Sequence, residues 1–256
     1  MEHGSFEAIA EWYDQTMGEQ GDRTHRHWLL PALLQALGDV AGKSALDLGC
    51  GNGLASRLLA EHGARVIGID LSHTLVARAR AREASNPLGI DALVADAAHL
   101  PFPPDRFDLV TAHMVLMDAA DGAGILREAG RVVRPGGRFV ATLLHPCFEP
   151  PLASAWTEET VDGERRTIRR VWRYRTAYSV ADRLHRDQPA PIMRYHRPLE
   201  WYARHLRDAG LLIDTLDEPL PDEVFAVARP ATYQRQLVAP SFLVLGARKR
   251  EPPATL

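Results

Sequence analysis

Residues 45–56 read Ala-Leu-Asp-Leu-Gly-Cys-Gly-Asn-Gly-Leu-Ala-Ser, and they say more about this chain than any other segment. An apolar run ends in an acidic residue, three glycines follow at alternate positions, and residues 54–62 are compatible with a helix. This pattern predicts a strand that turns sharply into a helix. Glycines at such a turn accept positive φ and let a ligand lie against bare backbone, beside the first N–H groups of the helix. We therefore expect a small polar ligand to bind there.

The spacing of the glycines indicates which ligand. The dinucleotide fingerprint is G-x-G-x-x-G, whereas this turn has G-x-G-x-G behind an aspartate. The pattern resembles motif I of the class I S-adenosylmethionine (SAM) methyltransferases. That resemblance implies that the turn binds SAM through Asp47, Gly49, Cys50, Gly51, Asn52 and Gly53.

Two further strand ends carry the same resemblance. The apolar run 65–69 ends in Asp70, followed by Leu71 and Ser72, and the run 90–95 ends in Asp96 and Ala97. A later Leu-Pro-Phe at 100–102 leads to Phe-Asp-Leu-Val at 107–110, as in this superfamily. A carboxylate at the end of the second strand can accept hydrogen bonds from both ribose hydroxyls. The resemblance implies that Asp70, Leu71, Ser72, Asp96 and Ala97 bind the cofactor, the last two at the adenine edge.

The remaining core pattern predicts the fold class. Residues 131–140, Arg-Val-Val-Arg-Pro-Gly-Gly-Arg-Phe-Val, resemble the family's turn from a helix end into strand five, where proline stops the helix and the glycine pair reverses the chain. Helix patterns at 54–62, 74–85 and 122–133 alternate with the strands. We expect an α/β, Rossmann-like, seven-stranded, mostly parallel sheet with an antiparallel last strand at 241–247 and helices on both faces.

The length predicts a single domain. With 256 residues, 46% of them hydrophobic, the chain can bury one core but is too short for two enzymatic domains. We expect a single SAM-dependent methyltransferase domain over 1–256, with an N-terminal helical region at 1–40. The irregular segment 146–197 resembles the superfamily's insertion after strand five, which implies a lid or substrate platform.

Composition bears on partners and location. The net charge of −3 provides no basic field for nucleic acid or an anionic membrane. The longest apolar runs fall short of the ~18 residues of a membrane span, and the first residues lack the features of a signal peptide. We expect a cytoplasmic protein without nucleic-acid or membrane partners. Its two cysteines and the spacing of its histidines predict neither a disulfide framework nor a metal site.

Three residues are candidates for the chemistry. Methyl transfer from a sulfonium is an in-line displacement that needs alignment and exclusion of water, and needs a base only where the nucleophile is protonated. Tyr13 resembles the tyrosine that the family closes over the methionine end of SAM, and is otherwise an aromatic residue of an N-terminal helix. His113, after strand four, is either a residue near the reacting methyl group or a structural histidine. His145, at the carboxyl end of strand five, is expected in the substrate pocket and is the first candidate for a general base.

The insertion contains an arginine and aromatic segment. If residues 169–178 form an extended strand, Trp172, Tyr174 and Tyr178 share one face, while Arg173 and Arg175 share the other. This arrangement fits an aromatic wall over a flat acceptor, an RNA-stacking surface or a solvated outer face. We expect a lid strand with a solvated outer face.

The predicted function is therefore SAM-dependent transfer of a methyl group to an O or N atom of a small-molecule metabolite. The alternatives are a methyltransferase that acts on a macromolecule, tRNA or protein, and a SAM-binding protein of this fold that transfers no methyl group. The sequence identifies neither the acceptor nor the oligomeric state.

Overall fold

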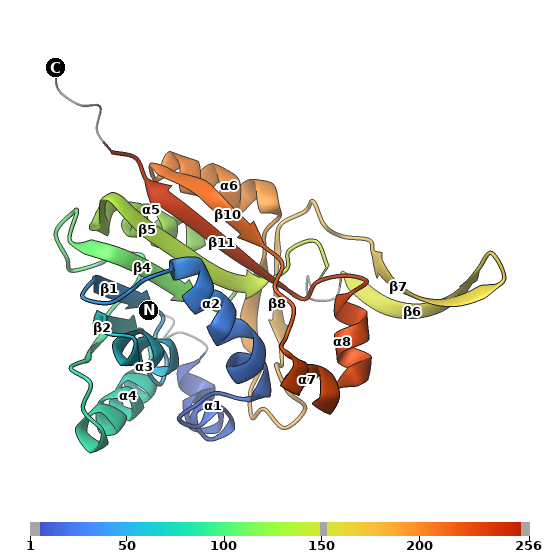
Figure 1. The fold of residues 1–256 in the computed structure, drawn as a ribbon, viewed down its shortest axis with the longest axis horizontal. Coiled ribbons are helices and arrows are strands. Elements are labelled where there is room, and N and C mark those ends of the chain that lie inside the picture. Colours follow the sequence, from blue (N-terminus) through green and yellow to red (C-terminus); the bar gives the residue numbers. More distant parts are fainter. Residues whose placement is uncertain (1–5, 149–152, 252–256) are drawn as a thin grey trace.

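The computed structural model describes residues 6–148 and 153–251, and a seven-stranded sheet forms its centre (Figure 1). The strand order is β10-β11-β5-β4-β1-β2-β3. The bounds are β1 (Ser44–Leu48), β2 (Arg65–Asp70), β3 (Asp91–Val94), β4 (Phe107–His113), β5 (Val133–Leu144), β10 (Leu211–Asp217) and β11 (Phe242–Lys249). Strand β11 runs antiparallel to β5 and β10, and the other pairings are parallel. The predicted fold class is confirmed.

Helices cover both faces of the sheet. The elements are η1 (Glu7–Ile9), α1 (Ala10–Met17), η2 (His25–Leu29), α2 (Leu30–Leu37), α3 (Leu54–Glu61), α4 (His73–Ser85), α5 (Gly122–Val132), α6 (Leu199–Asp208), α7 (Glu223–Ala228) and α8 (Pro230–Gln236). Successive residues of β5 point to opposite faces: Val140 packs with the buried residues of α2 and α3, whereas Phe139 packs with those of α5 and α6. Within the described residues, none of these helices is long and apolar enough to cross a membrane.

Two local details refine the expected elements. Strand β5 already begins at Val133, which pairs with Phe107, and its ladder resumes only at Arg138 opposite Leu109. The Pro-Gly-Gly turn therefore bulges out between two paired parts of one strand. Helix α6 begins at Leu199, because Pro198 stands at its N-cap in an extended conformation.

The insertion after β5 folds into two separate hairpins. One pairs β6 (Ser154–Val161) with β7 (Glu164–Val171), and the other pairs β8 (Tyr178–Asp182) with β9 (Ile192–His196). The β6–β7 hairpin projects from the body of the molecule (Figure 1). The expected insertion, 146–197, includes residues 149–152, which lie outside the described residues.

The expectation of one extended strand over residues 169–178 was wrong. Strand β7 ends at Val171, and the chain bends before β8 begins at Tyr178. Trp172 is 61% exposed, and the Arg173 guanidinium lies 4.2 Å from the centroid of the Tyr178 ring. Alternation of side chains requires continuous β conformation, so the bend removes the common aromatic face.

Candidate functional site

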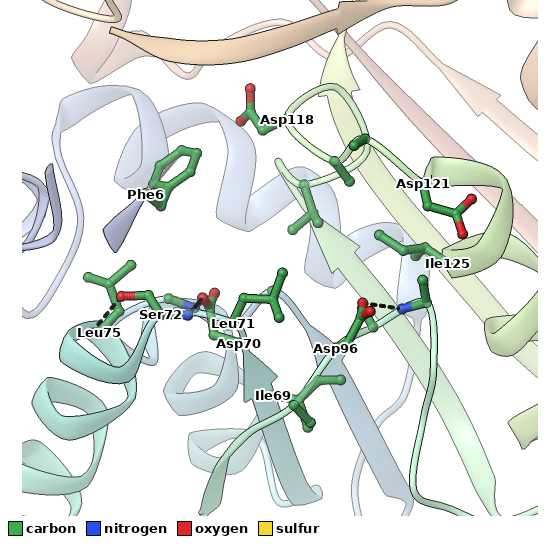
Figure 2. A pocket seen from close by; sticks show the side chains of 18 of the residues that line it. Phe6, Ile69, Asp70, Leu71, Ser72, Leu75, Asp96, Asp118, Asp121 and Ile125 are labelled. Atoms are coloured by element: carbon green, nitrogen blue, oxygen red, sulfur yellow. Dashed lines mark hydrogen bonds between the residues drawn. The ribbon is translucent and has the colours of Figure 1, made fainter. Parts of the chain in front are cut away.

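A cavity of about 500 Å³ lies where the carboxyl ends of β1, β2 and β4 meet the segment after β3. Its size falls in the range of small-molecule sites. The predicted cofactor residues in its lining are Tyr13, Gly49, Gly51, Asp70, Leu71, Ser72, Asp96, Ala97 and His113. Figure 2 shows Asp70, Leu71 and Ser72 at one side of the cavity, with Asp96 beside them. The carboxyl ends of neighbouring parallel strands share one edge, so motifs distant in sequence converge here.

The Asp70 carboxylate is held by backbone N–H groups. Gly51 N donates to its Oδ2 at 2.9 Å, and Ser72 N donates to its Oδ1 at 2.8 Å. Burial raises the pKa of Asp70, although the two hydrogen bonds oppose this effect. Each oxygen retains acceptor capacity beyond the bond it already makes. The group is therefore oriented and still able to accept hydrogen bonds from a ligand.

The turn after β2 is capped from two sides. The Ser72 hydroxyl accepts a hydrogen bond from Leu75 N at 3.1 Å, which makes Ser72 the N-cap of α4. The Glu7 carboxylate accepts hydrogen bonds from the hydroxyls of Ser72 and Thr74. Glu7 thereby ties the N-terminal segment to the rim of the cavity.

The first glycine of motif I permits a close approach of two loops. Gly49 has φ +67°, and a Cβ built there lies 2.4 Å from Val115 Cγ2. Val115 follows β4 and also lines the cavity. A side chain at position 49 would therefore require both a strained backbone and a displaced neighbouring loop.

Four predicted cofactor residues lie outside the cavity lining formed by the described residues. Asp47 is completely buried, and its Oδ2 accepts a hydrogen bond from Ser56 Oγ at 2.6 Å. Burial raises the pKa of Asp47 to about 7. Cys50 is buried beneath the turn, and burial raises the pKa of its thiol well above the usual range. Gly53, with φ +90°, caps α3.

Asn52, the fourth of these residues, serves the packing of the N-terminal helix. Its Nδ2 donates to Asp14 Oδ1 at 2.9 Å and to Gly18 O at 3.3 Å. The side chain thereby joins α1 to the glycine turn. Its contacts in the described residues are structural, and binding of a cofactor by Asn52 stays a prediction.

Asp96 and Leu71 present different chemistry to the same cavity. Asp96 Oδ1 accepts a hydrogen bond from Ala98 N at 2.8 Å, and Oδ2 lies 2.9 Å from His99 Nδ1. The Leu71 side chain is 51% exposed although it is apolar. An exposed apolar residue beside hydrogen-bonding groups suits a flat heterocycle with a polar edge.

Tyr13 and His113 lie on the other walls. The Tyr13 ring packs edge-on against Phe6 at 5.5 Å between centroids, and burial raises the pKa of its hydroxyl. His113 Nδ1 lies 2.7 Å from Thr142 Oγ1, and its buried Nε2 makes no hydrogen bond within the described residues. Burial, reinforced by neighbouring His25, lowers the pKa of His113 to about 3. His113 is therefore neutral throughout the physiological range.

His145 lies at the end of β5 but outside the cavity lining. Cys147 N donates to its Nδ1 at 3.2 Å, so Nδ1 carries no proton, and Nε2–H donates to Glu218 Oε1 at 2.9 Å. Burial lowers the pKa of His145, and Glu218 opposes that effect. Both ring nitrogens are thus hydrogen-bonded within the described residues, Nε2 to a half-exposed carboxylate. The role of His145 as a general base stays a prediction without support from this geometry.

The cavity also has lining residues that the sequence did not single out. They include Phe6, Asp118 and Asp121, together with Met193 and Tyr195 of β9. Asp118 and Asp121 could have been found from the sequence, because they are acidic residues in the loop after the fourth strand, at the edge of the sheet where ligands bind. Residues of β9 carry no such signal, because their proximity depends on the path of the insertion.

A backbone N–H and an arginine side chain fasten β9 and the chain that follows it to carbonyl groups of this loop. Tyr195 N donates to Met117 O at 2.7 Å. The buried Arg197 guanidinium donates to the carbonyls of Leu116 and Ala119 at 2.7 Å and to that of Ala120 at 2.9 Å. The second hairpin of the insertion is therefore part of the cavity wall.

Metal ligation is not evident in the part of the chain that the structure describes. No group of three or more His, Cys, Asp or Glu side chains there is arranged to hold a metal ion.

Comparison with known proteins agrees with the geometry. Residues 46–141 match the family described as "Methyltransferase domain". The ubiquinone biosynthesis O-methyltransferase of Aeromonas salmonicida is 37% identical over 150 residues, 56% of this chain and 61% of that protein. The 2-phytyl-1,4-naphtoquinone methyltransferase of Synechococcus elongatus is 36% identical over 154 residues, 58% of this chain and 66% of that protein. Each match thus spans less than two thirds of the curated relative.

A solved structure extends the similarity to nearly the whole chain. The S-adenosylmethionine dependent methyltransferase of Mesorhizobium loti is 32% identical with a TM-score of 0.70, and the match covers 86% of this chain and 96% of that one. The strand order, the ordered motifs at the strand ends and this match agree. The chain belongs to the class I SAM-dependent methyltransferase superfamily.

Proposed function

We propose that this protein binds SAM in the cavity and transfers its methyl group to an O or N atom of a small-molecule acceptor. The observation that carries the proposal is the meeting of Gly49, Asp70 and Asp96 in one cavity, together with space bounded by β9. Cofactor residues and acceptor space share one enclosure, as transfer between two bound molecules requires.

The residues of the cavity fit the parts of this cofactor. Asp70 is oriented to accept hydrogen bonds from ribose hydroxyls, and Asp96 with the N–H of Ala97 suits the adenine edge. Leu71 offers an apolar surface for the heterocycle. Tyr13 and His113 belong to the methionine end in this assignment, and the bare backbone at Gly49 leaves room for the ligand.

The protein's contribution to the reaction is chiefly positioning. A sulfonium supplies an activated methyl group when the cofactor is bound. The chain must align the nucleophile with that methyl group and exclude water, effects that reach ~7–11 kcal/mol when the geometry is good. The β8–β9 hairpin and the loop 114–121 supply the enclosing walls.

The names of the curated relatives support a small acceptor. Two of them are methyltransferases whose names refer to quinones, and the cavity wall near β9 includes the apolar Met114, Val115 and Met193. We propose that residues 146–197 form the acceptor side of a single domain, with the β8–β9 hairpin as its wall.

Calorimetric titration with SAM tests the proposal. Wild-type protein should bind SAM, and Asp70→Ala should bind it more weakly by ~1.5–3 kcal/mol, because hydrogen bonds to a charged acceptor are lost. Asp208→Ala, which removes an exposed carboxylate at the end of α6, is the matched control and should leave the affinity unchanged. NAD should not bind, and binding of NAD in competition with SAM would overturn the assignment.

Transfer itself is tested with a metabolite extract. Incubation with SAM should yield S-adenosylhomocysteine and a product heavier by one methylene group, both detected by mass spectrometry. SAM binding without either product across extracts would favour a binding protein of this fold, and methylation confined to added tRNA or protein would favour a macromolecular acceptor.

A further inference from the structure

We propose that Asp118 recognises the acceptor: its carboxylate receives a hydroxyl or amine of the acceptor and takes up the proton that this group loses during methyl transfer. The inference rests on the proposed function and names the chemical class of acceptor and the residue that selects it.

The position of Asp118 separates it from the cofactor residues. It lies in the loop between β4 and α5, and Figure 2 shows it across the cavity from Asp70 and Asp96. Asp118 N donates to Val115 O at 2.8 Å, which fixes the turn that carries the side chain. Its carboxylate is thus held at the side left for the acceptor.

The carboxylate is only partly compensated by its neighbours. Asp118 Oδ1 lies 3.6 Å from Arg194 Nε, a charge contact longer than a hydrogen bond. Arg194 Nη1 also lies 3.4 Å from Asp182 Oδ2. Two carboxylates therefore share one guanidinium and keep one net negative charge when both are ionised. Asp118 Oδ1 is buried and accepts no hydrogen bond within the described residues, so the negative charge on this carboxylate is not compensated by a hydrogen-bond donor.

The charge of the whole lining favours the same class of acceptor. The described lining residues include four carboxylates, Asp70, Asp96, Asp118 and Asp121, and neither lysine nor arginine. An anionic acceptor would be repelled without a compensating cation. A neutral or cationic hydrogen-bond donor would be attracted.

The protonation equilibrium of Asp118 suits the transfer of a proton. Burial raises the pKa of Asp118 to about 7, and Arg194 opposes the rise while Asp182 adds to it. The other charged or titratable groups that interact with it are Tyr13 of α1 and Tyr202 of α6. A group that titrates near neutral pH can both accept a proton and release it to solvent.

The two histidines do not compete for this role. The pKa of His113 is lowered to about 3, so His113 is a weak proton acceptor. Both ring nitrogens of His145 are already hydrogen-bonded. Neither histidine therefore replaces Asp118 as the candidate base.

Methyl transfer breaks two bonds and forms two. The O–H or N–H bond of the acceptor breaks, and its proton passes to a carboxylate oxygen of Asp118. The electron pair of the acceptor atom forms the new bond to the methyl carbon. The bond between that carbon and sulfur breaks, its electron pair stays on sulfur, and a neutral thioether remains. Asp118 then returns the proton to water.

Three probes of similar size test the recognition. Benzylamine, benzyl alcohol and benzoate are titrated calorimetrically into protein saturated with S-adenosylhomocysteine at neutral pH. Benzylamine should bind most tightly and benzoate most weakly. Asp118→Asn, which keeps the size of the side chain, should weaken benzylamine binding about tenfold or more. Asp182→Asn removes the other carboxylate beside Arg194 and should change the affinity less than about threefold.

Proton release on binding of benzylamine distinguishes a direct role of Asp118 from a structural one, because a structural role would produce no proton release. A carboxyl that is part-protonated near neutral pH must ionise when it pairs with an ammonium group. Titration in phosphate and in Tris should therefore give different heats with wild-type protein and equal heats with Asp118→Asn.

The pH dependence of benzylamine binding to wild-type protein tests the inference even if Asp118→Asn fails to fold. Affinity for benzylamine should rise from about pH 6 to about pH 8 as Asp118 ionises. Equal affinities for the three probes, a preference that survives in Asp118→Asn, a flat pH profile or no binding of any probe would each overturn the inference. Wild-type protein that fails to bind SAM would instead overturn the proposed function.

Discussion

Replacement of Asp47 by asparagine should stabilise the folded protein relative to the wild type, and by an amount that grows as the pH rises. The Asp47 side chain is completely buried, and its Oδ1 accepts no hydrogen bond within the described residues. Burial raises its pKa from the usual 3.8 to about 7, the nearby charge of Asp70 adds to the rise, and the hydrogen bond from Ser56 opposes it. Ionisation of this carboxyl therefore costs more in the folded chain than in the unfolded chain.

The sign and size follow from linkage. The pKa of Asp47 is higher in the folded chain than in the unfolded chain, so protonation of this carboxyl stabilises the folded state. This stabilisation is complete below about pH 3.8 and is lost as the pH rises to about 7. At about 1.4 kcal/mol per pKa unit, the loss is on the order of 4 kcal/mol. Asparagine stays neutral and retains an amide oxygen for Ser56, so Asp47→Asn should not lose this stability.

Urea unfolding from about pH 4 to about pH 8 measures the effect. The free energy of unfolding of Asp47→Asn, minus that of the wild type, should increase by ~4 kcal/mol across this range. The two proteins are compared by how their free energies of unfolding change with pH. The amide N–H of asparagine adds a hydrogen-bond donor at position 47, and the cost of burying this donor is the same at every pH. Asp208→Asn, an exposed control, should give no such trend. Parallel curves for Asp47→Asn and wild type would refute the assignment of a raised pKa to Asp47.

Three further outcomes are expected. Gly49→Ala should lower the free energy of unfolding by ~2–5 kcal/mol, because its Cβ would lie 2.4 Å from Val115 Cγ2 at φ +67°. Gly210→Ala, with φ +76° and open space around its Cβ, should cost only ~1–2 kcal/mol in the same urea assay, and equal costs would contradict the clash. On addition of SAM, hydrogen exchange should slow in the β8–β9 hairpin, because this hairpin lines the cavity. Exchange should stay unchanged in the β6–β7 hairpin, which projects from the body of the molecule. Equal slowing in both hairpins would indicate that the whole insertion acts as one lid. His145→Ala should lower turnover less than about tenfold, because both ring nitrogens of His145 are already hydrogen-bonded within the protein. A loss of turnover of ~10²–10⁴-fold with unchanged SAM affinity would instead identify His145 as the base.

Much of the proposed cofactor half of the site was predictable from local patterns. Parallel strands end at a common edge, so Asp70 and Asp96 could be placed together from their positions after apolar runs. Ser72 was also predictable as an N-cap, because a serine before a helical pattern satisfies a free N–H group. These features depend on residues close in sequence or on a rule of sheet topology.

The acceptor half was less predictable because its residues meet only through the path of the insertion. The alternation around Trp172 predicted a strand, but β7 ends one residue earlier. His145 directly follows a core strand, as expected, yet its ring is hydrogen-bonded to Glu218 and does not line the cavity. Side-chain direction at a strand end depends on the next turn, which the strand's own pattern does not encode.

By itself the sequence predicted the alternating strands and helices of the sheet core, the Rossmann-like class and the glycine and aspartate motifs at the carboxyl ends of its strands. Hydrophobic period, turn residues and motif spacing are local properties, and the rules for parallel sheets carry them to a common edge. Only the tertiary structure decided which motif residues line the cavity, burying Asp47 and placing Asp70 in the cavity lining. It alone brought Asp118 within 3.6 Å of Arg194, because contacts between distant segments depend on the packing of the whole chain.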